Sequence, residues 1–263
     1  MLTASRAFVP RATSQGRALP HIPELSKLYS QFGLRLSHGQ IIMVAGRPGA
    51  GKSAFALWLA MKTNLETLYF SADMSAATVT ARMAAFYTGD TTAEVHAARD
   101  RGEWEKYTKA LEQSRIGFSF GSPITWSNVD QYIESHVEVY DRIPELFIFD
   151  NLKDIEDCQF DYGMQMEAMQ NITELARNTG STVMVLHHAT NKGGFNPVQP
   201  PPVAAIKNGM TEQPEVVFGV GLDSNTNEFG VALLKQREGK QDPNAMHYQS
   251  LRADPERNRY DAF

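Results

Sequence analysis

The chain has only one cysteine, Cys158, among its 263 residues. A single thiol cannot form an intrachain disulfide, so the sequence excludes a disulfide-stabilised scaffold and is typical of a protein of the reducing cytoplasm. The sequence also lacks any apolar run close to the ~20 residues that a membrane-spanning helix needs. We therefore predict a cytoplasmic protein with no membrane partner.

The sequence has no excess of basic residues either. The 25 Lys and Arg residues are outnumbered by 30 Asp and Glu residues, which gives a net charge of −5. A surface coated in basic residues is thereby excluded, and any contact with nucleic acid has to be local, in a loop or on the inside of a ring. The length and the 42% apolar content predict one α/β domain with extensions.

Acidic residues are absent from the first 23 positions, where the charges come from Arg6, Arg11 and Arg17. Two interpretations remain open for this segment. It is either a targeting peptide, because such peptides are rich in Arg and Ser and poor in acids, or an arm that becomes ordered on a neighbouring subunit or on phosphate. We assign 1–35 to an arm or linker and 36–263 to the main domain.

The most informative stretch that is present is 46–53, which fits the phosphate-loop pattern G-x-x-x-x-G-K-[ST]. An apolar, β-branched run at 41–45 precedes it, and a helical, largely apolar segment at 54–61 follows it. Glycines allow backbone N–H groups to surround a polyphosphate at a helix N-terminus, while Lys52 reaches the phosphates and the Ser53 hydroxyl binds Mg²⁺. We expect a nucleoside triphosphate to be held by Gly46, Arg47, Pro48, Gly49, Ala50, Gly51, Lys52, Ser53 and Ala54.

Two further apolar runs end in polar residues. The run 146–150 ends in Asp150, which in a phosphate-loop protein holds Mg²⁺, usually through water. The run 182–186 leads into His187 and His188. Adjacent residues of a strand point in opposite directions, so these two imidazoles cannot chelate one metal ion together. One of them either senses the γ-phosphate or has a passive structural role.

Strands alternate with helices along most of the sequence, which predicts a parallel sheet with helices on both faces. The runs 216–222 and 229–235 surround a turn and are expected to form an antiparallel pair at the C-terminal edge of the sheet. Further strands are predicted at 67–71 and 116–120, and helices at 24–31, 76–87, within 91–114, at 126–139 and at 164–178. The end of the chain is polar and charged, with aromatic anchors at Tyr260 and Phe263.

Several separate stretches resemble one family, the RecA-like motor domain of the DnaB-type ring-shaped replicative helicases, including their phage relatives. The resemblance extends from about residue 36 to residue 239, and its motifs occur in the family's order. The matching stretches are 47–57, 71–75, 149–152, 186–191, 208–213 and 235–239. The resemblance implies a phosphate-loop ATPase core of the RecA-like α/β fold.

The resemblance also implies roles for individual residues. Lys52 and Ser53 hold the phosphates of ATP and Mg²⁺, and Asp150 lies behind the metal. Asp73 acts as the base that activates or orients water, in a position where the family has Glu. His188 reports the γ-phosphate to an adjacent loop that faces DNA.

The later motifs imply an assembly. Arg237, with Lys235 as a second candidate, reaches the nucleotide of the neighbouring subunit as an arginine finger. Hydrolysis then depends on a homo-oligomer, a hexameric ring if the head-to-tail contact closes and a filament if it does not. Lys192 and Lys207 are candidates for contacts with DNA phosphates, and a solvated surface lysine is the alternative interpretation for each.

Two departures from the family affect these expectations. Asp73 is one methylene shorter than Glu, which weakens water activation unless the site closes further, since a displacement of ~1 Å can cost about 10²-fold in rate. The sequence also lacks room for the N-terminal domain of full-length replicative helicases, so we expect the motor alone. Primase and loader proteins are candidate partners.

The favoured function is an ATP-dependent DNA helicase that acts on single-stranded or branched DNA in replication or recombination, in the bacterial host cytoplasm if a phage encodes it. A RecA-like recombinase and a nucleotide-gated loader are alternatives. A metal-dependent, structure-specific nuclease is another, suggested by the acidic residues that follow the strand at 146–150. These residues are Asp150, Asp154, Glu156, Asp157 and Asp161.

Overall fold

The structure is a computed structural model that describes residues 16–156, 158, 161–190 and 196–263. Within these residues the strands form one sheet in the order β3-β2-β4-β5-β1-β6-β7-β8-β9. Neighbours from β3 to β6 are parallel, and neighbours from β6 to β9 are antiparallel. The strands are β1 (Ile41–Gly46), β2 (Thr67–Ser71), β3 (Ile116–Ser119), β4 (Leu146–Asp150), β5 (Thr182–His188), β6 (Val216–Asp223), β7 (Glu228–Gln236), β8 (Gln249–Asp254) and β9 (Arg259–Ala262).

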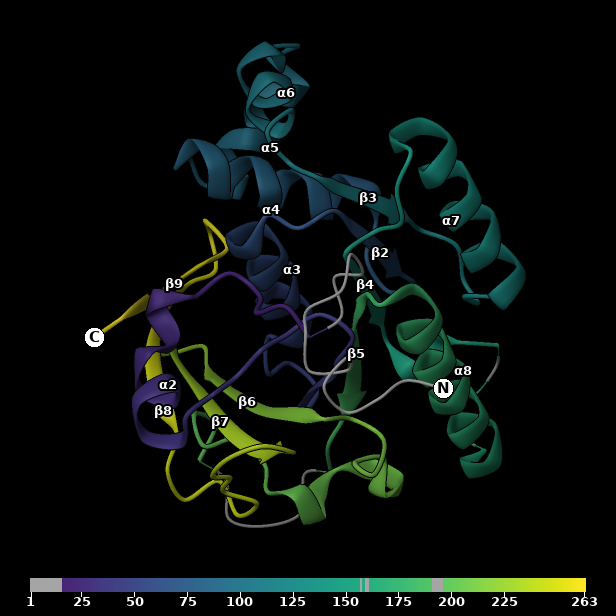
Figure 1. The fold of residues 1–263 in the computed structure, drawn as a ribbon. Coiled ribbons are helices and arrows are strands. Elements are labelled where there is room, and N and C mark those ends of the chain that lie inside the picture. Colours follow the sequence, from purple (N-terminus) through teal and green to yellow (C-terminus); the bar gives the residue numbers. More distant parts are fainter. Residues whose placement is uncertain (1–15, 157, 159–160, 191–195) are drawn as a thin grey trace.

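Helices cover both faces of this sheet (Figure 1). None of the described helices is long and apolar enough to cross a bilayer. Short 3-10 turns lie at Pro23–Leu25, Leu152–Asp154, Val203–Ala205 and Lys207–Gly209. The α-helices are α2 (Ser26–Phe32), α3 (Lys52–Thr63), α4 (Ala76–Thr88), α5 (Thr92–Asp100), α6 (Glu105–Leu111), α7 (Trp126–Tyr140) and α8 (Tyr162–Thr179).

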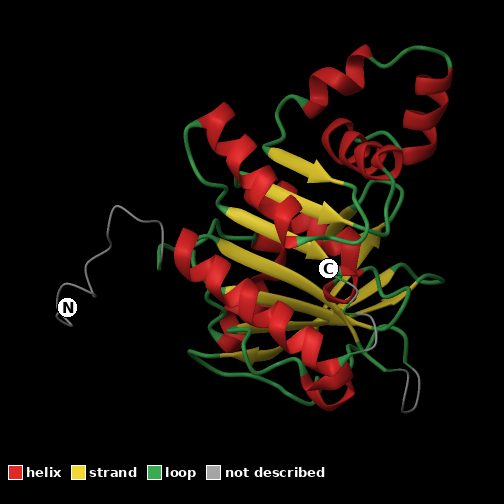
Figure 2. Ribbon diagram, turned by 90° about the vertical axis from the view of Figure 1, so that its right-hand side faces the viewer, coloured by secondary structure: helices red, strands yellow, loops and turns green. Residues whose placement is uncertain are grey.

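The central strand β1 separates two hydrophobic cores. Successive side chains of a strand point to opposite faces, so Ile42 and Val44 pack with α2 and α3, whereas Ile41 and Met43 pack with α7 and α8. All six residues of β1 are buried, as expected for a strand that is covered on both faces. The twist of the sheet is visible in Figure 2. The predicted fold, a mostly parallel sheet with an antiparallel C-terminal edge, is confirmed.

The C-terminal end differs from its prediction. Residues that were expected to be a polar tail form the β8–β9 hairpin, because alternate positions of β8 are buried. Tyr260 is a buried anchor, as expected, but Phe263 is 82% exposed, so its predicted anchoring role was wrong. Phe263 follows the last residue of β9 and has no strand beneath it to pack against.

The described residues that precede position 36 pack on the main domain. Ile22, Leu25 and Leu28 are fully buried in the same core as α3. Ala18 bridges to Ser37 in an antiparallel arrangement. These contacts make residues 18–36 an integral part of the folded unit, while the boundary at 35/36 stays a prediction.

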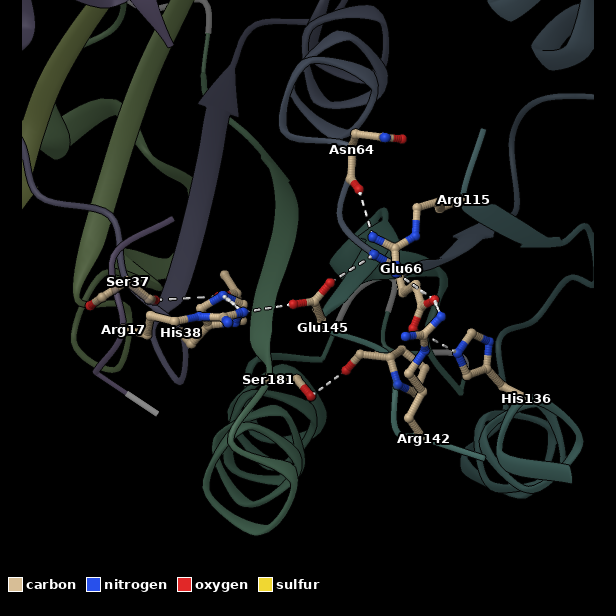
Figure 3. A network of polar contacts seen from close by, with 12 residues as sticks. Arg17, Ser37, His38, Asn64, Glu66, Arg115, His136, Arg142, Glu145 and Ser181 are labelled. Atoms are coloured by element: carbon tan, nitrogen blue, oxygen red, sulfur yellow. Dashed lines mark hydrogen bonds and ion pairs between the residues drawn. The ribbon is translucent and has the colours of Figure 1, made fainter. Parts of the chain in front are cut away.

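A polar network lies at the amino ends of β2, β4 and β5 (Figure 3). The Glu66 carboxylate is buried and accepts a hydrogen bond from Arg115 Nη2 at 2.6 Å; it also forms an ion pair with Arg142. Nearby, Glu145 pairs with Arg17 at 2.8 Å and its carboxylate accepts from the Glu66 N–H at 3.3 Å. The network therefore joins segments that are far apart in sequence, at the edge of the sheet opposite the phosphate loop.

The two arginines that bind Glu66 should be redundant with each other. We expect Arg115→Met or Arg142→Met alone to lower the free energy of unfolding by about 1 kcal/mol, and both together by about 3 kcal/mol, because only the double variant leaves a buried carboxylate without an arginine. Urea denaturation measures this. Arg101→Met, which removes an exposed pair with Glu103, is the control and should change little. Additive losses would contradict the shared role.

Candidate nucleotide-binding site

The phosphate loop connects the end of β1 to the start of α3. Gly49 and Gly51 have φ angles of 76° and 77°, in the left-handed region that favours glycine. This backbone lets the chain reverse within a few residues and directs the N-terminus of α3 toward the space enclosed by the loop. The structure therefore has a preformed cradle where the sequence pattern predicts one.

Lys52 is the first residue of α3 and is buried in this cradle. Its Nζ donates hydrogen bonds to the carbonyl oxygens of Gly46 at 3.3 Å and Arg47 at 3.1 Å. Burial lowers the pKa of Lys52 to about 8, although the nearby charges of Asp150 and Asp73 oppose this shift. The ammonium group therefore lies where an anion would relieve the cost of its burial.

A cavity of about 480 Å³ opens beside the loop. Among the residues that line it are Lys52, Ser53, Asp73, Asn151 and His188, which come from the carboxyl ends of β2, β4 and β5 and from the start of α3. The edge formed by the carboxyl ends of parallel strands is where α/β sheets bind ligands. The sequence predicted four of these five residues, and Asn151 is the addition.

Asp150 is completely buried at the end of β4. The Tyr69 hydroxyl donates a hydrogen bond to its Oδ2 at 2.9 Å. Burial raises the pKa of Asp150, and the hydroxyl groups of Ser53 and Tyr69 oppose this rise. Its Oδ1 makes no hydrogen bond of good geometry with the described residues. Sequence reasoning missed Tyr69, which looks like an ordinary aromatic residue of a buried strand.

Ser53 and Asp150 together suit Mg²⁺. Both offer oxygen, the ligand that this cation prefers, and Mg²⁺ is commonly bound through one or two protein side chains, water and substrate phosphates. No group of three or more His, Cys, Asp or Glu side chains that could hold a metal ion occurs in the described part of the chain. A site that depends on phosphate and water for its remaining ligands fits this donor set.

Asp73 follows the end of β2 and its side chain is 53% exposed. The Asn151 Nδ2 donates a hydrogen bond to its Oδ2 at 2.9 Å, and the Lys153 Nζ lies 3.8 Å from the same oxygen. The pairing of β2 with β4, with Ser71 opposite Asp150, brings Asp73 next to this segment. Only long-range strand pairing reveals Asn151 and Lys153 as neighbours of Asp73.

The two histidines at the end of β5 point in opposite directions. His187 is buried and its Nε2 is 2.9 Å from the Lys207 carbonyl oxygen. His188 lines the cavity, with its Nδ1 3.5 Å from Lys52 Nζ. Burial, followed by the charge of Lys52, lowers the pKa of His188 to about 4. His188 is therefore a neutral imidazole at pH 7, and its Nδ1 accepts from the ammonium group.

The Pro-rich segment 196–202 packs against the sheet and contacts the phosphate loop. Arg47 Nη1 donates a hydrogen bond to the Gln199 carbonyl oxygen at 3.0 Å. Beneath the segment, Gly221 and Gly230 are partners across β6 and β7. A Cβ atom at Gly221 would lie 2.6 Å from the Val198 carbonyl oxygen, and one at Gly230 would overlap the same oxygen. Glycine at both positions is what permits this close approach.

The two lysines predicted to contact DNA have different positions. Lys192 lies outside the described residues. Lys207 is exposed, and its backbone carbonyl is the partner of His187. A bridge between Ala189 and Ile206 fixes the backbone beside it to the end of β5. Lys207 is thus on the same edge of the sheet as the phosphate loop.

Arg237 and Lys235 lie at the opposite ends of the parallel strands from the phosphate loop, next to the amino end of β1. Arg237 follows β7, is 63% exposed and has its Nη1 3.4 Å from Glu215 Oε1. Lys235 donates to the carbonyl oxygens of Thr211 and Glu212. Because Glu215 N binds the Ile41 carbonyl at the start of β1, Arg237 is about 16 Å along the strand from Gly46. Neither side chain reaches the cavity of its own chain.

The acidic residues after β4 do not converge where they are described. Asp154 binds Lys153 and Asn151, while Glu156 accepts from the Trp126 N–H. Asp161 caps α8 by accepting from the Met164 N–H, and Asp157 lies outside the described residues. Ordinary structural hydrogen bonds therefore account for the described members of this group.

The β8–β9 hairpin also lines the cavity, which the sequence did not predict. Its lining residues include Asp254, Pro255, Asn258 and Tyr260. The Asn258 Nδ2 donates to the Ala54 carbonyl oxygen at 3.3 Å and thereby joins the hairpin to α3. The buried–exposed alternation of 249–254 was the available signal for a strand here.

The fold and the cavity define a phosphate-loop nucleotide-binding protein of the RecA-like α/β class. Comparison with known proteins gives the family. Residues 29–251 match the family model described as the DnaB-like helicase C-terminal domain, and the chain belongs to this family.

The chain is also similar to two named phage proteins and to several solved structures. The chain is 28% identical over 256 residues to the Gene 65 protein of Mycobacterium phage L5, covering 93% of this chain and 94% of the relative. The Gene 65 protein of Mycobacterium phage D29 is 29% identical over 220 residues, covering 80% and 94%. The fold resembles a separately solved ATPase domain, with a TM-score of 0.74 at 15% identity and coverage of 96% and 93%.

A DnaB-like replicative helicase, solved in a study of its interactions with primase, has the same fold, with a TM-score of 0.75 at 15% identity. This alignment covers 93% of the present chain and 62% of that helicase. A more distant likeness is the KaiC-like protein PH0186 from Pyrococcus horikoshii OT3, with a TM-score of 0.57 at 16% identity and coverage of 89% and 94%. At these identities the structures support the fold alone.

Removing the Tyr69 hydroxyl should weaken the metal site without disrupting the cradle. We expect Tyr69→Phe to raise the Mg²⁺ concentration for half-maximal binding of a fluorescent ATP analogue by about tenfold, because Asp150 loses the donor that orients it. Tyr107→Phe is the matched control, since it removes a similar 2.8 Å bond to Asp90 in the α4–α6 region. An unchanged Mg²⁺ requirement in Tyr69→Phe would contradict this role for Tyr69.

Proposed function

We propose that the chain is the motor of a DnaB-type helicase, which hydrolyses ATP with Mg²⁺ to move along single-stranded DNA and unwind duplex DNA. The observation that carries this proposal is the convergence of Lys52, Asp73, Asp150 and His188 at one edge of the parallel sheet, around a preformed phosphate cradle. Membership of a helicase family supports it. We infer a cytoplasmic location from this function.

The side chains have complementary tasks in this mechanism. Lys52 exchanges its contacts with the Gly46 and Arg47 carbonyls for contacts with the β- and γ-phosphates. Ser53 and Asp150 would hold Mg²⁺, which supplies charge neutralisation at the phosphates when bound. Asp73 accepts a hydrogen bond from the attacking water and orients it.

His188 contributes as a neutral donor. Its Nδ1 accepts from Lys52, so the ring proton belongs on Nε2, which is free to donate to a γ-phosphate oxygen. The loss of that phosphate removes a partner of His188. The position of Lys207 beside this strand end supports a path from His188 to DNA, with Lys207 and Lys192 as the proposed phosphate contacts.

A second copy would complete the site. Arg237 is remote from the cavity of its own chain and exposed, which supports action on a neighbour's nucleotide, with Lys235 as its accessory. Such a finger is worth about 10³–10⁵ in rate. We infer a head-to-tail homo-oligomer, a hexameric ring or a filament. The helicase studied with primase supports a primase as a further partner, and a loader protein stays a second candidate.

Mixing two inactive variants tests this function. Lys52→Ala disables the cradle, and Arg237→Ala removes the finger, so each alone should lose DNA-stimulated ATP hydrolysis. A mixed assembly should regain up to about a quarter of the wild-type rate, because about one interface in four joins an intact cradle to an intact finger. Turnover, assembly mass and unwinding of a forked duplex are measured together.

The control and the alternative outcomes are specific. Glu215→Gln removes the charge that pairs with Arg237 within its own chain, keeps an oxygen for the Ile41 N–H, and should leave complementation intact. Full activity of Arg237→Ala alone, or no recovery in mixtures that do assemble, would contradict the finger. Strand exchange by filaments without unwinding would favour a recombinase, and ATP binding without turnover on single-stranded DNA would favour a loader. DNA cleavage that survives Lys52→Ala would favour a nuclease.

A further inference from the structure

We propose that Asn151 is a positioning residue that fixes the orientation of Asp73 for water activation. This inference rests on the proposed function, because it assigns a task within the same hydrolysis reaction. The pattern that predicts Asp150 passes over the next residue, which is only one of several polar residues after β4. The structure assigns it a defined contact, a hydrogen bond from Nδ2 to Asp73 Oδ2 at 2.9 Å.

Asp73 needs an external anchor. Its side chain is half exposed and follows the last residue of β2, so its own surroundings hold it weakly. Its carboxylate is also one methylene closer to the backbone than that of Glu, and a displacement of ~1 Å in a reacting group can cost about 10²-fold in rate. A donor at a fixed position beside this carboxylate reduces the range of orientations it can adopt.

Asn151 is suited to be that anchor because it is itself held rigidly. It is only 4% exposed. Its backbone N–H donates to Asp154 Oδ2 at 3.2 Å, and its Nδ2 lies 3.3 Å from the same oxygen. The backbone bond is part of the 3-10 turn Leu152–Asp154, in which the Asp154 N–H in turn donates to the Asn151 carbonyl oxygen at 3.0 Å, and Asp154 is itself buried. The Asn151 amide is therefore fixed to a buried turn and in turn restrains the exposed carboxylate of Asp73.

The choice of an amide also matters for charge. An amide N–H is a neutral donor that does not give up its proton, so it orients the Asp73 carboxylate without adding a charge beside it. It occupies one lone pair of Oδ2, and the remaining lone pairs of both oxygens stay available for water. Lys153 Nζ is more distant, at 3.8 Å, and donates to Asp154 Oδ1 at 2.7 Å. Asn151 is therefore the closer and better directed partner of Asp73.

A double-mutant cycle on single-turnover ATP hydrolysis tests this role, with single-stranded DNA present. Asn151→Ala should lower the rate constant by about 10- to 100-fold, with the dissociation constant of a fluorescent ATP analogue changed less than about twofold, since the contact does not involve the phosphates. Asp73→Ala should lower the rate at least as much. The double variant should be no slower than Asp73→Ala, because Asn151 acts through Asp73.

Asn258→Ala provides the matched control. It removes another buried amide from the same cavity, one that binds the Ala54 carbonyl and does not contact Asp73. Any effect of Asn258→Ala on the rate constant should be additive with that of Asp73→Ala, and should persist in the double variant. If Asn151→Ala proves unfolded by thermal denaturation, Asn151→Ser replaces it, since serine keeps a polar side chain in the capped turn and is too short to reach Asp73.

The outcomes separate this inference from the function on which it rests. Wild-type turnover together with additive losses in the Asn151/Asp73 cycle would overturn the role of Asn151 and leave the motor intact. A parallel loss of nucleotide affinity in Asn151→Ala would likewise overturn it in favour of a binding role. Absence of turnover in the assembled wild-type protein with DNA would overturn both proposals.

Discussion

The burial of the Lys52 ammonium inside a loop of backbone carbonyls is the interaction on which the rest of this site depends. Burial lowers the pKa of Lys52 to about 8 and raises that of Asp150. Two groups of opposite charge are thus both partly deprived of water, a pattern typical of functional sites. A polyphosphate would pair with Lys52, and its cation would pair with Asp150. The loss of hydration that makes these two groups costly to bury therefore also favours binding of the ligand.

The two ends of the parallel strands carry different chemical groups. The parallel strands β1, β2, β4 and β5 end together at the cradle, whereas the antiparallel return of β7 carries Arg237 to the opposite edge. A sheet with this topology separates a nucleotide site from its candidate finger by the full length of a strand. In the proposed mechanism, a neighbouring copy brings these two ends of the strands together.

The sequence predicted those parts of the site that are encoded locally. The phosphate loop and Asp150 each follow an apolar strand, and their chemistry is determined by adjacent residues. Tyr69 and Asn151 could not be assigned, because their roles arise from contacts between β2 and the end of β4, about 80 residues away. The β8–β9 hairpin was missed because polar residues on its exposed face masked the alternation, and Phe263 was misjudged because it lies just beyond the last residue of β9.

The contact between the Pro-rich segment and the sheet limits how this region can vary. At Gly221 and Gly230 two backbones touch with no side chain between them. Even a methyl group on either strand would push the segment outward and stretch the bond between Arg47 and Gln199. We therefore expect relatives with a larger residue at either position to carry this segment along a different path. Their phosphate loop would then be stabilised by contacts other than the bond between Arg47 and Gln199.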